Sequence, residues 1–264
     1  MPTVSDIMSR NPVTLGPDSS VGEALDLMVN RNIGCIYVVD NLGALLGVFT
    51  ERELIEDLEK HKEVRTEVKL HELMSMSVMP IPPEISVKDA AKTMIDSKVR
   101  LAVTKDNKVV GVVTASDLVR AFSTGAENRS IEGVVTQKVK SLDANNTVID
   151  AVHLMHEKRI GSVVVMKDGR PYGLFTERDL VKFLAQGAKE RLIDIRLEEA
   201  ASRPLITAKI GVTAREVASI MKSNKIKRLP LTQGVVPVAI ITARDLVETY
   251  VTTGLPTLAT TASD

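Results

Sequence analysis

The 264 residues contain 34 Lys and Arg and 34 Asp and Glu, so the chain has no bulk field that would attract a polyanion. Trp is absent and aromatic residues are 3%, which removes the stacking surfaces that single-stranded nucleic acids need. The single cysteine, Cys35, excludes an internal disulfide and favours a reducing compartment. No apolar run approaches the roughly 20 residues of a membrane span, and residues 1–12 lack the basic start and apolar core of a signal peptide. We therefore expect a cytoplasmic protein without a membrane partner.

One pattern, an apolar run followed by Thr-x-x-acid, occurs four times. It is TEREL at residues 50–54, TASDL at 114–118, TERDL at 176–180 and TARDL at 242–246. The threonines are therefore 64, 62 and 66 residues apart. A period this constant indicates a repeat architecture.

The first repeat shows the order of elements that all four share. Its apolar spacing predicts an extended piece, a helix, a strand, a turn, a strand and a helix, at residues 12–15, 19–30, 35–39, 40–43, 45–49 and 51–58. The first helices of the later repeats are expected around 87–94, 148–155 and 217–221, and their strand pairs at 101–103 and 109–113, 162–166 and 172–175, and 229–231 and 236–241. The predicted fold class is α+β, with the unit β-α-β-β-α repeated four times.

An alternation between odd and even repeats indicates that a two-repeat unit was duplicated. Repeats 1 and 3 have Ile-Gly before Cys35 or Ser162 and share TER, whereas repeats 2 and 4 have Arg100 and Arg228 at the aligned position and share TA. We predict two paired modules, residues 1–125 and 126–264. Their repeats are expected at about 4–60, 70–124, 131–186 and 197–252, with the module boundary at 123–128, charged linkers at 61–69 and 186–196 and a flexible tail from about 255.

The Thr-x-x-acid group has a structural and a functional interpretation. A threonine at a strand end with an acid three residues later is a helix capping box. The same hydroxyl and carboxylate at a helix start could hold a ribose diol, with an arginine for a phosphate. Arginine precedes the acid in three copies, as Arg52, Arg178 and Arg244, although a helix start disfavours cations. The sequence shows no structural reason for these arginines, which favours ligand binding over simple solvation.

These four units, each of about 60 residues and three of them ending in Gly-h-h-T-x-x-acid, resemble the CBS domain, named for cystathionine β-synthase. They cover nearly the whole chain, as in the regulatory γ subunit of AMP-activated protein kinase and in prokaryotic proteins made only of CBS domains. The resemblance implies repeats paired through their sheets, with clefts that bind AMP, ADP or ATP and occasionally S-adenosylmethionine. It further implies a regulatory protein that is not an enzyme, whose partners are adenine nucleotides and a regulated protein or a second copy of the chain.

The resemblance also assigns site residues. The implied ribose ligands are Thr114 with Asp117, Thr176 with Asp179, and Thr242 with Asp245. The implied phosphate ligands are Arg52, Arg100, Arg178, Lys227, Arg228 and Arg244. The clefts of Asp117, Asp245 and Asp179 would draw respectively on Arg52 and Arg100, on Arg178 and Arg228, and on Arg244 and Arg228. Adenine would lie near Val13, Ile81, Val139 and Ile206.

Repeat 1 departs from the family pattern. Its pair is Thr50 with Glu53, one methylene longer than Asp, and its partner residue is Ser116 instead of a basic residue. We expect that cleft to bind weakly or to stay empty.

Other constellations have simpler interpretations. His153 and His156 could bind zinc only with a third ligand, and the aligned residues of other repeats indicate a surface or interface face, so no metal is predicted. The aligned methionines Met28, Met94, Met155 and Met221 are expected in the core. The basic run 222–228 could contact nucleic acid, but the zero net charge and the phosphate role implied for its end favour nucleotide binding. Two alternatives stay open: a regulatory subunit for S-adenosylmethionine or nucleic acid, and a structural module with empty clefts.

Overall fold

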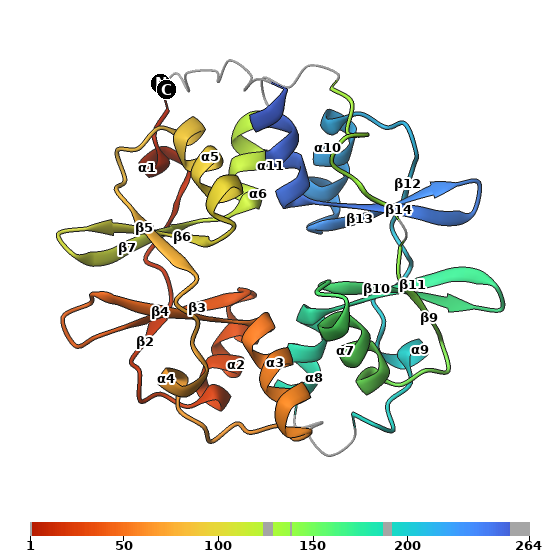
Figure 1. Ribbon diagram of the computed structural model, residues 1–264, viewed down its shortest axis with the longest axis horizontal. Helices are drawn as coiled ribbons and strands as arrows, with labels where there is room; N and C mark the ends of the chain where they lie inside the picture. Colours follow the sequence, from red (N-terminus) through yellow and green to blue (C-terminus); the bar gives the residue numbers. More distant parts are fainter. Residues whose placement is uncertain (1, 124–128, 138, 187–191, 254–264) are drawn as a thin grey trace. The chain divides into compact units, whose positions relative to one another are not determined.

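The structure, a computed structural model, describes residues 2–123, 129–137, 139–186 and 192–253. The four repeats each fold as one small sheet with two helices, and the α+β class is confirmed (Figure 1). Repeat 1 contains β2 (Thr14–Leu15), α2 (Val21–Asn30), β3 (Cys35–Val39), β4 (Leu45–Thr50) and α3 (Glu51–His61). Repeat 2 contains β5 (Val78–Ile81), α5 (Val87–Ser97), β6 (Arg100–Lys105), β7 (Lys108–Val113) and α6 (Ala115–Ser123).

The second half of the chain repeats this order. Repeat 3 contains β9 (Ser141–Asp143), α7 (Val148–Glu157), β10 (Ser162–Lys167), β11 (Arg170–Thr176) and α8 (Glu177–Ala185). Repeat 4 contains β12 (Ala208–Lys209), α10 (Ala214–Asn224), β13 (Arg228–Gln233), β14 (Val236–Thr242) and α11 (Ala243–Thr252). In every repeat the first strand runs parallel to the second and the second antiparallel to the third.

The antiparallel register fixes where the Thr-x-x-acid group lies. Cys35 is opposite Thr50, Ser162 is opposite Thr176, and Arg228 is opposite Thr242. The residue that begins the first core strand therefore lies beside the threonine that begins the following helix, as the alignment of the repeats required.

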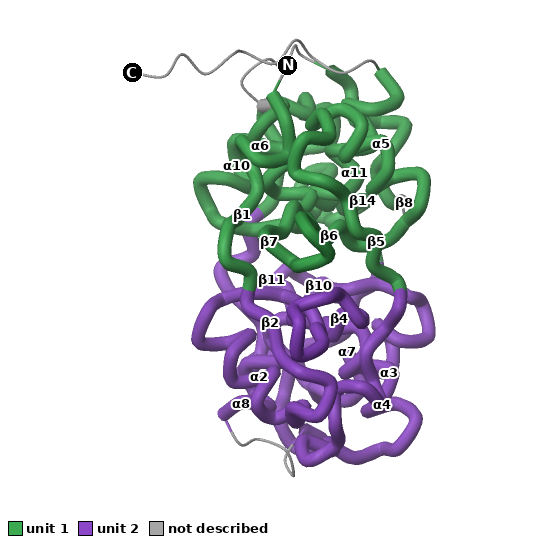
Figure 2. The backbone as a smooth tube through the Cα atoms, turned by 90° about the vertical axis from the view of Figure 1, so that its left-hand side faces the viewer, with its two compact units in different colours: residues 1–12, 77–139, 207–264 green, residues 13–76, 140–206 purple. Residues whose placement is uncertain are grey.

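The chain divides into two compact units that alternate along the sequence (Figure 2). Unit 1 comprises residues 1–12, 77–139 and 207–264 and contains repeats 2 and 4; unit 2 comprises residues 13–76 and 140–206 and contains repeats 1 and 3. The predicted modules 1–125 and 126–264 combine repeats of different units, and that pairing stays a prediction. The boundary residues 124–128 and the predicted tail lie outside the described residues.

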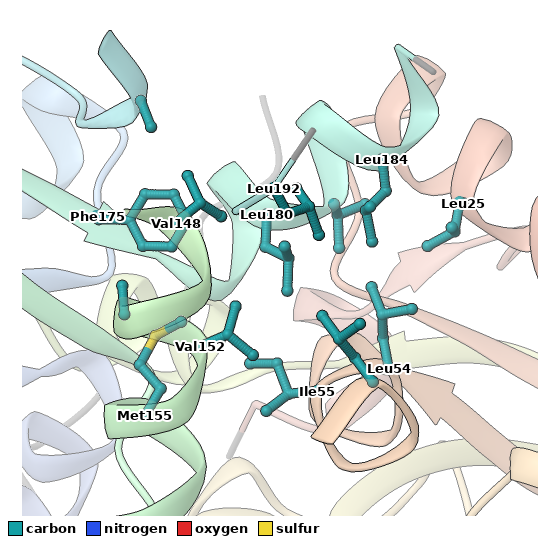
Figure 3. Packing of buried hydrophobic residues seen from close by; sticks show 14 of the residues in the cluster. Leu25, Leu54, Ile55, Val148, Val152, Met155, Phe175, Leu180, Leu184 and Leu192 are labelled. Atoms are coloured by element: carbon teal, nitrogen blue, oxygen red, sulfur yellow. The ribbon is translucent and has the colours of Figure 1, made fainter. Parts of the chain in front are cut away.

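Each unit is built around helices from its two repeats. In unit 1 helices α5 and α6 pack with α10 and α11, and in unit 2 helices α2 and α3 pack with α7 and α8. The unit 2 core joins Leu25, Leu54 and Ile55 of repeat 1 to Val152 and Leu180 of repeat 3 (Figure 3). The buried faces follow helical spacing, and their removal from water is the main stabilising term.

The aligned methionines confirm the prediction that they belong to the core. Met28 and Met155 are fully buried, and Met94 and Met221 are 5% and 4% exposed. Met fills irregular gaps between helices because it is unbranched and flexible.

A short segment comes before each repeat in the sequence. In the structure it pairs with a strand of another repeat. Helix α1 (Val4–Ile7) and β1 (Ser9–Arg10) come before repeat 1, yet β1 extends the repeat 2 sheet beside β7. Strand β8 (Thr136–Gln137) comes before repeat 3 and extends the repeat 4 sheet beside β14. Helices α4 (Leu70–Leu73) and α9 (Leu197–Ala200) lead into Ser75 and Ser202, which bridge to Val48 of repeat 1 and Leu174 of repeat 3.

We call these short segments the crossing segments. Their close approach explains the glycine that stands three residues before the motif threonine in repeats 1, 2 and 3. A Cβ at Gly173 would lie 2.9 Å from the carbonyl oxygen of Ser202, and one at Gly47 would lie 3.0 Å from that of Ser75. The backbone of the crossing segment thus approaches the strand too closely for a side chain at these positions. Repeat 4 has Ala239 there, next to Gln137 of β8.

Candidate functional site

The four Thr-x-x-acid groups form the predicted helix starts. In each copy the threonine backbone amide donates to the acid three residues later, at 2.7–3.0 Å. Full capping boxes are present at α3, α8 and α11, and at α6 the Thr114 hydroxyl also donates to Asp117 at 2.6 Å. The structural interpretation of the motif is therefore confirmed, and it fixes the carboxylates that the functional interpretation requires.

The three motif aspartates differ in the partners of the carboxylate oxygen that does not accept from the threonine amide. Asp117 Oδ1 accepts a hydrogen bond from Arg120, and Asp179 Oδ1 accepts one from Ser202 at 3.1 Å and lies 3.4 Å from Lys182 Nζ. The residue three positions after Asp245 is Glu248, and Asp245 forms no ion pair within the described part of the chain. The backbone amide and the hydroxyl group of Thr242 both donate to the Asp245 carboxyl group.

The environment of Asp245 is also electrostatically distinct. Burial raises its carboxyl pKa and Glu248 adds to this rise, whereas the Thr242 hydrogen bonds and the positive charge of Arg244 oppose it. A buried carboxylate that forms no ion pair with a described residue gains from a hydroxyl donor, because that donor stabilises its charged form.

The arginines of unit 2 have structural partners, contrary to the interpretation drawn from the sequence. Arg52 lies 3.1 Å from Glu177 Oε1, and Arg178 Nε donates to Glu51 Oε1 at 2.8 Å. Arg178 Nη1 also donates to Asn32 Oδ1 at 2.7 Å. The arginine of each repeat thus pairs with the glutamate of the other repeat. These ion pairs offset the unfavourable position of a cation at a helix start.

Arg244, the motif arginine of unit 1, has a different partner. In both repeats of this unit an alanine, Ala115 or Ala243, stands where unit 2 has glutamate. Arg244 instead donates to the carbonyl oxygen of Met94 at 2.6 Å. Burial lowers the pKa of Arg244 and the positive charge of Arg100 lowers it further, whereas Asp245 and Glu248 raise it.

Two more basic residues lie at the same helix start. Arg228 is opposite Thr242 in the sheet, and the carbonyl oxygen of Lys227 accepts from the Ala243 amide at 2.9 Å. We call Arg100, Lys227, Arg228 and Arg244 the basic cluster of unit 1. The sequence predicted each of its members as a phosphate ligand, and all four belong to unit 1.

The remaining predicted residues are distributed over both units. Val13 packs against the unit 2 core, Ile81 is buried in β5 of unit 1, and Val139 and Ile206 are half-buried. The three predicted clefts each combine residues of unit 1 and unit 2, so these combinations stay predictions.

Sequence reasoning missed Glu51 and Glu177 as partners of the motif arginines. The available signal was the alternation itself, because Glu accompanies Arg in repeats 1 and 3, whereas Ala occupies the position in repeats 2 and 4. Gly34 belongs to the same arrangement, since a Cβ there would lie 3.0 Å from Arg178 Nη2 and 3.1 Å from Glu51 Oε1.

An open hollow of about 660 Å³ is lined by residues of repeat 1 and of the segment that follows it, and none of them is a predicted site residue. Its lining includes Asp18, Glu23, Asp40 and Glu67, with Lys69. Four carboxylates against one ammonium group would repel a phosphate, so the hollow does not fit the predicted ligand.

The predicted helix face around His153 lies against α3, where His153 Nδ1 is 3.4 Å from Glu59 Oε2. Across the described residues, no group of three or more His, Cys, Asp or Glu side chains could hold a metal ion. In the same part of the chain, none of the helices has the length and apolar character needed to cross a membrane.

Comparison with known families matches residues 4–60, 70–124, 131–186 and 197–252 to the CBS domain. The chain belongs to the CBS domain family. Its sequence is 26% identical over 263 residues to the uncharacterized protein MJ1404 of Methanocaldococcus jannaschii, covering 93% of this chain and 61% of MJ1404. It is 24% identical over 270 residues to MJ1225 of the same organism, covering 92% of this chain and 96% of MJ1225.

Solved structures show the same fold. The crystal structure of MJ1225, proposed as an archaeal homologue of γ-AMPK, gives a TM-score of 0.82 at 22% identity and covers 94% of this chain and 100% of that one. An uncharacterized conserved protein from Pyrococcus horikoshii gives a TM-score of 0.64 at 22% identity, covering 94% and 99%. The four tandem CBS domains and their architecture are thereby established.

Proposed function

We propose that this CBS protein is a regulatory protein, without catalytic activity of its own, that binds AMP, ADP or ATP and changes a partner's activity. The observation that carries the proposal is the start of α11, where the Asp245 carboxylate has no ion pair among the described residues and the neighbouring Arg244 forms part of the basic cluster. A ribose hydroxyl would donate to the carboxylate, and the guanidinium groups would bind the phosphates.

The family and the fold support this assignment. The chain consists of four CBS domains, for which the family resemblance implies adenine nucleotides, and it has the fold of a protein proposed as an archaeal homologue of γ-AMPK. Nucleotide binding would act on a partner only through different affinities for two states of this protein.

A thermal-shift screen of the full chain, freed of carried-over ligand, tests the proposal. A ligand at about 100 times its Kd adds roughly 2.7 kcal/mol per site, which raises the midpoint by several degrees. We expect that rise with at least one of AMP, ADP and ATP. The absence of a shift with every one of them would overturn the proposal, and a shift with S-adenosylmethionine alone would replace it with a sulfonium ligand.

Arg244→Gln separates these two outcomes. A nucleotide phosphate would lose a charged partner and bind about tenfold more weakly or worse. S-adenosylmethionine has no phosphate, so its binding would change little. Arg10→Gln, which alters an exposed arginine of β1 in the same unit, is the matched control.

A further inference from the structure

The same motif position has opposite electrostatic character in the two units. In unit 2 it is Glu51 and Glu177, whereas in unit 1 it is Ala115 and Ala243. The alignment is secure because all four residues directly follow the threonine that begins the helix, and Cys35, Ser162 and Arg228 are paired opposite three of those threonines.

The unit 2 glutamates occupy the arginines that a phosphate would otherwise bind. Glu51 Oε1 accepts from Arg178 Nε at 2.8 Å, and the side chain of Glu51 is 12% exposed while that of Arg178 is 20% exposed. Glu177 is 8% exposed and lies 3.1 Å from Arg52. Charges removed from water to this degree interact more strongly than surface pairs, because solvent screens them less.

A carboxylate and a phosphate compete for a guanidinium because both accept from its fork of donors. Asn32 holds Arg178 from a second direction, and Gly34 leaves room for the Arg178–Glu51 pair. An incoming phosphate would therefore have to displace Glu51, and the repulsion between the two anions would grow with the charge of the phosphate chain.

Unit 1 offers the reverse arrangement. Arg244 donates to a neutral carbonyl oxygen, that of Met94, and forms no ion pair with any described residue. Arg228 begins the strand opposite the same helix start. The positive charge of Arg100 acts on Arg244 against the opposing charges of Asp245 and Glu248, so an oligophosphate held by both arginines would relieve the repulsion between them.

We propose that Glu51 and Glu177 determine phosphate selectivity, by blocking the arginines of unit 2 and leaving oligophosphate recognition to the basic cluster of unit 1. The proposal rests on the proposed function and specifies its ligand: the cluster favours nucleotides with more phosphates. Sites that depend on Arg52 or Arg178 would favour the least charged adenosine ligands.

Isothermal titration of the full chain with AMP, ATP and inorganic tripolyphosphate tests this division. Glu51→Gln keeps an oxygen for Arg178 but removes the negative charge, so ATP and tripolyphosphate should bind about tenfold more tightly and AMP by clearly less. Glu56→Gln makes the same change at an exposed position of α3 and should alter none of the affinities.

Ala243→Glu transfers the unit 2 glutamate to unit 1 and should weaken ATP about tenfold more than AMP. Because Ala243 is only 6% exposed, Ala115→Glu at the half-buried equivalent position provides the same test with less strain. Circular dichroism and the unfolding midpoint establish that each variant is folded.

The outcomes separate the two proposals. Unchanged ATP-to-AMP ratios in Glu51→Gln and in a folded alanine-to-glutamate variant would overturn the selectivity proposal while nucleotide binding stands. If the affinity for tripolyphosphate changes with these substitutions as expected but no nucleotide binds, the proposed function is overturned. The roles of the glutamates and of the basic cluster in phosphate binding would then still stand. Absence of binding by every probe would overturn both.

Discussion

The carboxyl group of Asp245 accepts a hydrogen bond from the backbone amide of Thr242 at 2.7 Å, and burial raises the pKa of that carboxyl above its ordinary value of 3.8. The native state therefore binds this proton more tightly than the unfolded state does. Linkage makes the contribution to stability greatest below pH 3.8, and it is lost as pH rises through the raised pKa.

Asp245→Asn should consequently stabilise the free protein at neutral pH. The amide oxygen can still accept from Thr242, while the cost of burying a charge is removed. We expect a higher denaturant midpoint at pH 7 and a difference from the parent that shrinks as pH falls towards 3.8. Asp117→Asn serves as control, because it loses the ion pair with Arg120 and should destabilise by up to about 1 kcal/mol. A lower midpoint for Asp245→Asn at pH 7 would contradict the assignment.

The binding role of Asp245 is tested by truncation. Asp245→Ala should weaken adenine-nucleotide binding about tenfold to a hundredfold, the effect of losing one or two charge-assisted hydrogen bonds. Glu53→Ala in repeat 1 should change binding little, because that cleft is expected to be weak or empty. Titration calorimetry measures both, and equal losses would contradict the predicted difference between repeat 1 and repeat 4.

Gly173 should not tolerate a side chain. A Cβ would lie 2.9 Å from the carbonyl oxygen of Ser202 and 3.0 Å from the Ala201 Cβ, so backbone would have to move. Gly173→Ala should cost about 1–3 kcal/mol in the free energy of unfolding. Gly133→Ala has no atom within 4 Å of the added carbon, and a change within about 0.5 kcal/mol is expected. Similar values for the two variants would refute the close approach of the crossing segment.

The hydroxyl group of Tyr250 is buried without a hydrogen-bond partner among the described residues, and its ring lies 5.3 Å from that of Phe122. Tyr250→Phe keeps the ring contact and removes the unsatisfied group, so unfolding should require about 1 kcal/mol more. Phe122→Ala opens a cavity in the same contact and should cost about 3–5 kcal/mol. Equilibrium urea denaturation compares them; a loss of stability in Tyr250→Phe would reveal a partner for the hydroxyl.

Local patterns predicted the repeats and their strands and helices, because apolar spacing and the Thr-x-x-acid caps act within a few residues of each other. They could not predict that β1 joins β7, since a strand of two residues has no periodicity and its partner is a hundred positions away. Local patterns could not predict the Arg178–Glu51 pair either, because its residues are far apart in the sequence. The joint occurrence of Glu and Arg in repeats 1 and 3 was nevertheless a signal for it. For the candidate site, the sequence supplied the residue types and the i,i+3 partners Arg120 and Lys182, which Asp245 lacks because Glu248 stands at that position. Only the fold shows that Ser202 also donates to Asp179.

The alternation of the units along the chain bears on synthesis. Unit 2 ends at residue 206, whereas unit 1 needs segments from both the first twelve residues and those after 206. On a ribosome, the N-terminal segment is made first, and α1 and β1 must wait for repeat 2 before they find their neighbours. Unit 2 can therefore fold before the last segment of unit 1 has been synthesised. Unit 1, which contains the first residues of the chain, is the unit completed last.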